Sequence, residues 1–557
     1  MVPDAAPVAR GGDTAVGIGM TSPAPRASNP EQTSAPAAAS VGQPPFVEPL
    51  PEPRAAAFPR PALAHLLRAA AVLALASLIP YAHEGLADHR YWDRLDASAL
   101  LRAVTFTPPP SADAVLAAGL PPGDGEELAA ADLDALAGVA RPGGPGTAAD
   151  PSVPPAVLPA ESATAAVAAA TPEALVVDPA ALGPQKVWIE GAPGVLAPFH
   201  RALGDLALGR KSHVRIAHYG DSHTANDGIT HVTRQLLQRR FGDGGHGFSL
   251  VQGRTQWYAH KGVTRSASAT WRVVNFLSGN ARDGAYGYGG VAAEGGPGSS
   301  FTLGTGPKHV GSRFLLFYRS QGAATVSARL GRTPLQPLVI TEPADTDAMR
   351  EWQVPEASQG VAWRVTAGRV RLFGGAVERE RGIVYDSLGE VGARGPRWLQ
   401  ADAAHLKRQM ELRPPDLLIV NYGGNEATDR VSEANYLARM QQVLSRLRAG
   451  HPGGACLVIG PGDHGKRRGG KVISDPDVVR INDWQRKLAG LGGCGFFDAR
   501  GFMGGEGSMG RWFEQGLGWA DFSHFTARGE QAMGLALYRA ILKDLQQFRG
   551  GVAQGPK

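Results

Sequence analysis

Two short segments of the 557-residue chain combine the residue types of a serine nucleophile and its base. Gly220-Asp221-Ser222-His223 lies between an apolar run and a helical pattern, and Asp521-Phe-Ser-His524 lies near the C-terminus. A serine hydroxyl is a weak nucleophile until a base removes its proton, and an acid must hold that base in the correct tautomer. Ser222, His524 and Asp521 are therefore candidates for nucleophile, base and orienting acid in acyl transfer.

Two further segments have groups that could stabilise the negative charge developing on an ester oxygen. Asn425 follows Gly423-Gly424 at the end of the run DLLIVNY. A side-chain amide there can donate to an oxyanion, and losing such a donor costs about 3 kcal/mol. Gly392, after the run GIVYD, offers a backbone N–H with no side chain to obstruct a substrate. Taken singly, each of the four segments is also typical of a helix cap or a turn.

The elements that must position these segments alternate between strand and helix. Apolar runs predict strands at 214–220, 382–389 and 416–424, with two more in CLVIGP and CGFFDA. Helical spacing predicts a helix over 194–209, one from the Ser222 segment to about Arg240, one with Tyr436, Met440 and Leu444 inward, and one over 529–545. Such alternation predicts an α/β fold with a parallel sheet covered on both faces. The candidate residues then lie at the carboxyl ends of strands, where open α/β sheets bind ligands.

Composition divides the chain into further regions. Residues 245–380 break the alternation with glycines and short alternating runs, which predict an antiparallel β-sandwich inserted into an α/β domain at 186–244 and 381–557. Residues 1–60 are rich in Pro, Ala and Ser and predict a disordered leader, and residues 85–185 predict an Ala/Pro-rich linker.

Residues 61–84 contain a membrane-like segment. Its uninterrupted apolar part, Ala69 to Ala82, is about 14 residues long, which is short for a spanning helix and typical of a signal core. Extending it back to Leu63 reaches about 20 residues. Arginines on its N-terminal side predict that everything downstream is exported. We expect an uncleaved anchor, with a cleaved signal peptide as the alternative.

Composition and motifs argue against other functions. The net charge is only +5 and no nucleic-acid-binding signature is present, so we expect no nucleic-acid partner. No phosphate loop and no set of residues with metal-ligand spacing is found, so we expect no cofactor and no metal. The two cysteines, Cys456 and Cys494, each open an apolar run. A disulfide between neighbouring strands and a pair of buried thiols both fit that placement.

Taken together, in the order Ser, Gly, Asn, Asp-x-x-His, the four segments resemble the blocks of the SGNH/GDSL hydrolases. The resemblance covers about 186–545 and implies a three-layer fold with a central parallel five-stranded sheet. It implies a catalytic triad of Ser222, Asp521 and His524. It also implies an oxyanion hole formed by the N–H groups of Ser222 and Gly392 and by the side chain of Asn425.

A narrower resemblance is to the bacterial peptidoglycan O-acetylesterases and the related periplasmic O-acetyltransferases. It rests on HYGDSHTANDGITHVTRQLLQRRFGDGGHGF, NYGGNEA and MGGEGSMGRW, and on the β-rich, carbohydrate-binding-like insert at 245–380. It implies cofactor-free removal of acetyl groups from a cell-envelope polysaccharide such as peptidoglycan, at the periplasmic face of the inner membrane. Transfer of the acetyl group to a sugar hydroxyl remains open, because the two activities differ in how well the site excludes water.

An alternative function and an alternative role for one tryptophan remain beside this interpretation. A non-catalytic glycan-binding protein with a relic triad is the alternative from another functional class. Trp512, in the last of the quoted segments, is either a platform for a sugar ring or a residue of the core. The oligomeric state is left open.

Overall fold

The computed structural model describes residues 173–554 except 307–309, and all of these belong to one of the chain's two compact units, Pro109–Lys557. The expected leader (1–60), membrane-like segment (61–84) and most of the linker lie outside the described residues. Within the part of the chain that is described, none of the helices has both the length and the apolar character needed to cross a membrane.

The main sheet has the strand order β1-β19-β16-β15-β2-β14. The five strands from β19 to β14 run parallel, whereas the short edge strand β1 pairs antiparallel with β19. The expected α/β class is thereby confirmed. The strand bounds are β1 (Ile189–Glu190), β2 (His213–Gly220), β14 (Gly382–Gly389), β15 (Leu417–Asn421), β16 (Ala455–Ile459) and β19 (Gly495–Phe497).

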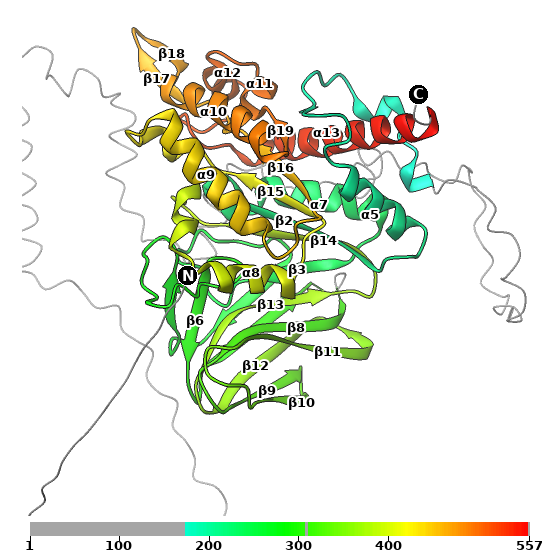
Figure 1. Ribbon diagram of the computed structural model, residues 1–557, viewed down its shortest axis with the longest axis vertical. Coiled ribbons are helices and arrows are strands. Elements are labelled where there is room, and N and C mark those ends of the chain that lie inside the picture. The colour runs from blue at the N-terminus through cyan, green and yellow to red at the C-terminus, as the bar shows by residue number, and fades with distance from the viewer. Residues whose placement is uncertain (1–172, 307–309, 555–557) are drawn as a thin grey trace, which may run out of the picture. The chain divides into compact units, whose positions relative to one another are not determined.

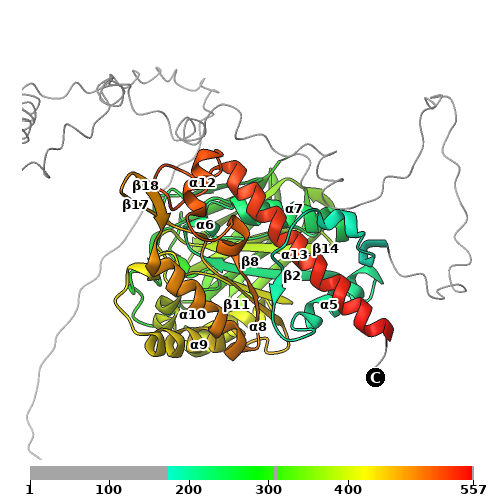
Figure 2. The same ribbon diagram turned by 90° about the horizontal axis from the view of Figure 1, so that it is seen from above.

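Helices cover both faces of this sheet, as Figures 1 and 2 show. Side chains alternate across a strand, so β2 sends Ile216 to the core beneath α5, α7 and α13, and Ala217 to the core beneath α8, α9 and α10. The helix bounds are α5 (Ala197–Ala207), α6 (Ser222–Ala225), α7 (Gly228–Phe241), α8 (Ala403–Leu412), α9 (Glu433–Arg448), α10 (Pro476–Gly492), α11 (Ala499–Met503), α12 (Ser508–Glu514) and α13 (Ala527–Gln554). Short 3-10 turns are η4 (Glu173–Leu175), η5 (Pro179–Leu182), η6 (Gly395–Gln400) and η7 (Glu426–Thr428).

Two expectations about the α/β part were wrong. The helix expected to run unbroken from the Ser222 segment to Arg240 is two helices, because Asp227 between α6 and α7 adopts a left-handed conformation with φ 57°. The packed region also begins before residue 186, since Leu175, Val177 and Leu182 lie in the same core as α13. The sequence did not indicate this, because these few apolar residues lie within an Ala/Pro-rich segment.

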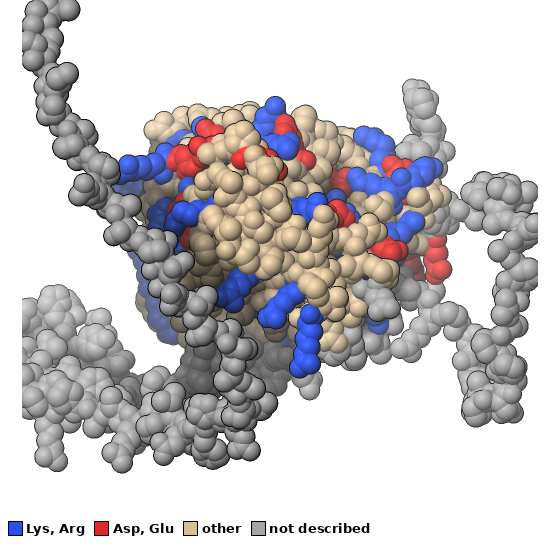
Figure 3. Space-filling view, turned by 90° about the horizontal axis from the view of Figure 1, so that it is seen from below, with Lys and Arg blue, Asp and Glu red and all other residues tan. Residues whose placement is uncertain are grey.

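The insert consists of two antiparallel sheets, ordered β10-β9-β12-β7-β4 and β11-β8-β13-β6-β5, with β3 added beside β13. Phe301 and Trp363 of the first sheet share one apolar core with Phe314 and Leu372 of the second. On the face shown in Figure 3, basic and acidic side chains are interspersed. The strand bounds are β3 (Gly245–Ser249), β4 (Val263–Ala267), β5 (Arg272–Asn275), β6 (Val291–Gly295), β7 (Ser300–Thr305), β8 (Gly311–Ser320), β9 (Ala324–Leu330), β10 (Thr333–Ile340), β11 (Asp347–Ser358), β12 (Gly360–Ala367) and β13 (Val370–Glu378).

A buried ionic cluster joins the insert to the α/β part. The Arg413 guanidinium, at the end of α8, donates to both carboxylate oxygens of Asp386 on β14, at 2.6 and 2.8 Å, and to Glu378 of β13 at 2.7 Å. Asp386 also accepts the backbone N–H of Phe248 on β3 at 2.8 Å. Burial would raise the pKa of Glu378, but Arg413 and Arg215 hold that pKa well below its usual range.

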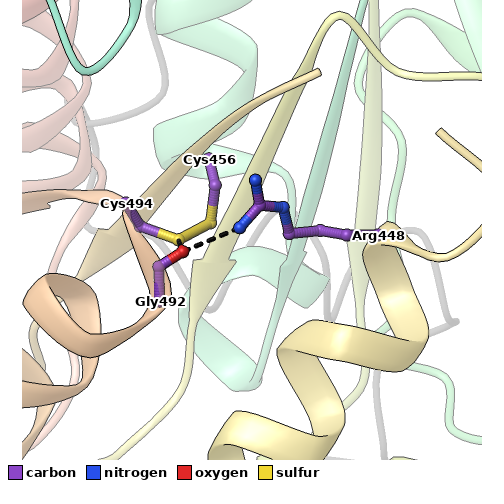
Figure 4. Close-up of a disulfide and its surroundings, with 4 residues drawn as sticks. All are labelled: Arg448, Cys456, Gly492 and Cys494. Carbon is purple, nitrogen blue, oxygen red and sulfur yellow. Dashed lines mark hydrogen bonds between the residues drawn. A yellow bond between two sulfur atoms is a disulfide. The ribbon is translucent and has the colours of Figure 1, made fainter. Parts of the chain in front are cut away.

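Cys456 and Cys494 form a disulfide, so the alternative of two free thiols was wrong (Figure 4). The pairing follows from the sheet, because Leu457 of β16 lies in register with Gly495 of β19 and the cysteines immediately precede them. Beside the bridge, Arg448 of α9 donates to the carbonyl of Gly492 at 2.7 Å.

Removing this disulfide should destabilise the protein substantially. The bridge closes a loop between residues 38 positions apart, and restricting a loop of that size in the unfolded chain contributes about 3–4 kcal/mol in the chain-entropy estimate. We expect the double variant Cys456→Ala/Cys494→Ala to unfold at lower urea concentration than the oxidised protein. If dithiothreitol shifts the wild-type midpoint but leaves that of the double variant unchanged, the effect belongs to the bridge. Equal midpoints for the oxidised protein and the double variant would contradict the prediction.

Candidate active site

Ser222 lies at the carboxyl end of β2, where it is the first residue of α6. Asp221 caps that short helix by accepting the N–H of His223 at 3.1 Å. Residue 220, before Asp221, must be a glycine, because a Cβ there would stand 2.1 Å from Thr224 Oγ1 and 2.9 Å from the carbonyl oxygen of Asn421. The tight strand-to-helix turn therefore places the serine hydroxyl at the edge of the sheet.

The Asp521–His524 turn brings its histidine to this serine. Ser222 Oγ lies 3.0 Å from His524 Nε2, and His524 Nδ1 lies 2.7 Å from Asp521 Oδ2. The other oxygen of Asp521 accepts the N–H groups of Ser523 and His524, at 2.9 and 3.0 Å. Burial opposes the charged form, but these hydrogen bonds lower the pKa of Asp521. An ionised carboxylate is thus held against the ring nitrogen opposite the one that faces Ser222.

The expected oxyanion donors lie beside the nucleophile turn. Asn425, directly after the turn that follows β15, has its Nδ2 3.1 Å from the carbonyl oxygen of Ala393 and 3.5 Å from Asp221 Oδ2. Gly392 precedes Ala393 and has φ 75°, and no atom stands within 4 Å of the place where its Cβ would be. The backbone at Gly392 is therefore open to a bound molecule, and Asn425 connects the Gly392 turn to the residue before Ser222.

His223 connects the serine turn to the histidine turn, a role that the sequence did not reveal. Its Nε2 lies 3.0 Å from the carbonyl oxygen of Ser523 and its Nδ1 3.3 Å from Asp221 Oδ1. Its ring stacks on that of His524 with the centroids 5.3 Å apart. Burial lowers the pKa of His223, but Asp221 outweighs burial and the net shift is upward. We interpret His223 as a positioning residue that holds the two turns in register.

A hairpin that periodicity did not predict supports the histidine turn from the other side. Its strands are β17 (Gly465–Arg468) and β18 (Lys471–Ser474), and they include the basic run at 466–468. The N–H of Gly465 donates to the carbonyl of Phe522 at 2.8 Å, and the Arg467 guanidinium lies 5.0 Å from the centre of the Phe522 ring. Phe522 has φ 53°, so this packing holds a conformation that few residues adopt.

Trp512 does not face the site, so its assignment to substrate binding was wrong. Its side chain is buried in the core beneath α13, against the ring of Phe525, and its Nε1 donates to the carbonyl of Met503 at 3.2 Å. The residue belongs to α12, whose short amphipathic turn faces inward. From the sequence alone, a tryptophan before a turn fits both a place in the core and a place facing the site.

A buried carboxyl group beside Asn425 should make stability depend on pH. Glu426 accepts the N–H groups of Gly395 and Gly423, at 2.7 and 3.1 Å, yet burial raises its pKa to about 8. Between the ordinary glutamate pKa and that value, the folded protein binds more protons than the unfolded chain. The contribution of Glu426 therefore makes stability fall as pH rises through this window, by at most about 1.4 kcal/mol per pH unit.

Glu426→Gln removes this titrating carboxyl group and should make the free energy of unfolding fall less steeply between pH 5 and pH 8. The measurement is the free energy of unfolding in urea at several pH values. Glu433→Gln, on α9, is the matched control, since that side chain is 39% exposed and pairs with Lys487, and it should leave the slope of the wild type. Identical slopes for Glu426→Gln and the wild type would contradict the prediction.

Part of the chain matches a known protein family. Residues 357–532 match the GDSL-like lipase/acylhydrolase family, a range that contains Gly392, Asn425, Asp521 and His524. Ser222 lies before that range, separated from it by most of the insert. No curated protein matches the chain.

Among solved structures, the chain resembles one described as a peptidoglycan O-acetylesterase in action. That match has a TM-score of 0.57 at 23% identity, over 65% of this chain and 99% of that one. A family two carbohydrate esterase from Clostridium thermocellum in complex with cellohexaose matches at a TM-score of 0.20 and 11% identity, over 51% of this chain and 100% of that one. Of these two matches, only the first shows a shared fold. The protein thus contains a domain of the GDSL-like lipase/acylhydrolase family, is an ester-bond hydrolase of the SGNH type, and resembles the O-acetylesterases in fold.

Proposed function

We propose that the protein is a serine O-acetylesterase that removes acetyl groups from a cell-envelope polysaccharide such as peptidoglycan. The observation that carries the proposal is the continuous chain of contacts from Ser222 Oγ to His524 Nε2 at 3.0 Å and from His524 Nδ1 to Asp521 Oδ2 at 2.7 Å. Nucleophile, base and orienting acid are then in the geometry that acyl transfer through a serine requires.

In the proposed reaction, Ser222 Oγ attacks the carbonyl carbon of the acetyl ester while His524 Nε2 accepts the hydroxyl proton. The oxygen becomes negatively charged and receives hydrogen bonds from the N–H groups of Ser222 and Gly392 and from the side chain of Asn425. Collapse of this intermediate breaks the bond to the sugar oxygen, which takes the proton from His524. Water then attacks acetyl-Ser222 with His524 as base, which releases acetate and restores the serine.

The choice of substrate is supported by the fold. The similar structure is described as a peptidoglycan O-acetylesterase, and this chain covers nearly all of it. We further propose that the segment at 61–84 anchors the protein to the inner membrane or directs its export, so that the active site meets the polysaccharide outside the cytoplasm. Fusion of a periplasm-active reporter after residue 172 would test the export step, because that reporter is silent in the cytoplasm.

The exposure of the site favours hydrolysis over transfer to a sugar. The side chains of His524 and Asp521 are 48% and 50% exposed, so water can reach an acyl group on the neighbouring Ser222. A transferase must instead protect that acyl group from water until its acceptor binds. Chromatography of the products formed with an added sugar acceptor separates the two activities.

The test of the proposed function is the release of acetate by the full-length protein from O-acetylated peptidoglycan. We expect free acetate in proportion to the enzyme added, and little acetylated acceptor when chito-oligosaccharide is present. Peptidoglycan from which the acetyl esters have been removed by mild alkali is the control and should yield none. Hydrolysis of p-nitrophenyl acetate without any release from the polysaccharide would reject the substrate and keep the esterase.

A further inference from the structure

A loop from the start of the insert contacts two of the catalytic segments. This loop, residues 251–262, connects β3 to β4. The N–H of Ala259 donates to the carbonyl of Ala225 at 2.8 Å, at the end of the short helix that begins with Ser222. Arg254 donates from Nη2 to the carbonyl of Val391, directly before Gly392. The 251–262 loop therefore lies next to both the nucleophile turn and the turn of the proposed oxyanion hole.

Several contacts hold the 251–262 loop in one conformation. Tyr258 is buried, accepts the N–H of Leu250 at 3.3 Å on its hydroxyl, and has the Arg265 guanidinium 4.4 Å from its ring centre. Arg265 also donates to the carbonyl of Tyr258 at 2.9 Å, and the N–H of Lys261 donates to Asp227 at 2.7 Å. A loop fixed in this way loses little further conformational entropy when a ligand binds to it.

One aromatic side chain of the 251–262 loop is exposed. Trp257 is 57% exposed, and it is the only tryptophan among the described residues that is mostly in contact with solvent. The next residue, Tyr258, is buried, and its N–H donates to the carbonyl of Thr255 at 3.4 Å, which closes the backbone turn that contains Trp257. The Cα atoms of Trp257 and Ala259, which are two positions apart in the sequence, lie at most about 7 Å apart. The exposed indole thus extends from a fixed loop that contacts the helix beginning with Ser222 and the turn containing Gly392.

We propose that Trp257 is a specificity-determining residue, which packs its indole against a pyranose ring of the acetylated polysaccharide while the acetyl ester lies at Ser222. The inference rests on the proposed function and assigns part of substrate recognition to the insert. One face of a pyranose ring carries mostly C–H groups and is apolar, so it can cover a flat aromatic surface that is otherwise in water. The rigid indole supplies this contact area at little cost in side-chain entropy.

The two parts of the substrate contact different residues in this proposal. The acetyl group contacts the catalytic residues in any ester, whereas the sugar ring contacts Trp257 only in a polysaccharide. A change at Trp257 should therefore affect polysaccharide substrates and leave a small ester such as p-nitrophenyl acetate unaffected. Burial of roughly half an indole is compatible with a tenfold effect on binding, which corresponds to about 1.4 kcal/mol.

The experiment compares Trp257→Ala with Trp257→Phe in the full-length protein. For Trp257→Ala we expect KM for O-acetylated peptidoglycan to rise about tenfold, with kcat/KM for p-nitrophenyl acetate unchanged. Trp257→Phe keeps an aromatic face and should recover most of the loss. Leu491→Ala, an exposed apolar side chain at the end of α10, is the matched control and should match the wild type on both substrates. Equal changes on both substrates, or no change with either, would overturn the proposal.

A binding measurement keeps this inference separable from the proposed function. The Ser222→Ala protein should bind insoluble peptidoglycan lacking O-acetyl groups, and adding Trp257→Ala should reduce the bound fraction. If no acetate is released by the wild type but Trp257 still governs binding, the reaction is wrong and the sugar contact stands. If acetate is released but Trp257 affects neither KM nor binding, the sugar contact is wrong and the reaction stands.

Discussion

Replacing Ser222 by alanine should lower kcat/KM for p-nitrophenyl acetate by at least about 10³-fold. The variant loses the atom that forms the acyl-enzyme, which is also the hydroxyl that lies 3.0 Å from the base, His524 Nε2. The residual rate is expected to come from the oxyanion donors acting on a water-catalysed reaction. The measurement is the steady-state rate at saturating and at low ester concentrations.

Stability should hardly change in the Ser222→Ala variant. Ser222 is the first residue of α6, and the capping hydrogen bond to that helix comes from Asp221 rather than from the serine. We therefore expect the wild-type urea midpoint to be retained within about 0.5 kcal/mol. Ser327→Ala, on β9 of the insert, is the matched control and should keep full activity. Retention of more than a tenth of the wild-type rate by Ser222→Ala would show that another group is the nucleophile.

Replacing Arg413 by methionine should destabilise the protein by about 3–5 kcal/mol at neutral pH. Arg413 is fully buried and contacts the carboxylates of Asp386 and Glu378 at 2.6–2.8 Å. Methionine fills much of the volume but leaves the buried Asp386 without its paired cation, and leaves Glu378 with only Arg215 and Arg313. Because those carboxylates also receive contacts from the insert, we expect the loss to appear in the unfolding of the described domain as a whole.

The pH dependence of this loss follows from the pKa of Glu378. In the wild type that pKa is depressed, so the stability from the cluster is present above the unfolded pKa and is lost as pH falls. In Arg413→Met the same carboxyl keeps Arg215 but loses Arg413, which raises its pKa relative to the wild type, and protonation then relieves part of the penalty. The difference between the two proteins should therefore be larger at pH 7 than at pH 4.

The control for Arg413→Met is Arg408→Met on the same helix. Arg408 is half exposed and lies 3.5 Å from Glu411. Exposed ion pairs contribute little, so we expect a change of no more than about 0.5 kcal/mol. Equal stability of Arg413→Met and the wild type at pH 7 would mean that the cluster is neutral to the fold.

Much of the site could be predicted because its parts lie at the ends of strands. Each apolar run of about five to eight residues marks a strand, and parallel strands bring their carboxyl ends to one edge of the sheet. Ser222, after β2, and Asn425, after β15, were placed together on that basis alone. The Asp-x-x-His spacing then required only a turn to bring the acid to its histidine, because the two residues are close in sequence.

The remaining features depend on partners that are distant in sequence. Trp512 and Trp257 are both tryptophans next to polar residues, and only packing against α13 or its absence makes one buried and the other exposed. His223 contacts a carbonyl 300 positions away, and Arg413 meets Glu378 across the boundary between insert and sheet. No local pattern records such contacts.

The same division explains the elements that were missed. Helical periodicity could not reveal the break at Asp227, because the contacts that hold this residue are not part of the helical pattern. The Asp227 carboxylate accepts hydrogen bonds from Arg234, at 2.7 Å, and from the N–H of Lys261 in the insert. Local patterning, with a period of two or 3.6 residues, specifies strands, helices and the turns between them. Tertiary structure decided which histidine and which tryptophan face the site and whether the two cysteines meet, because those contacts arise only when the sheet, its helices and the insert pack.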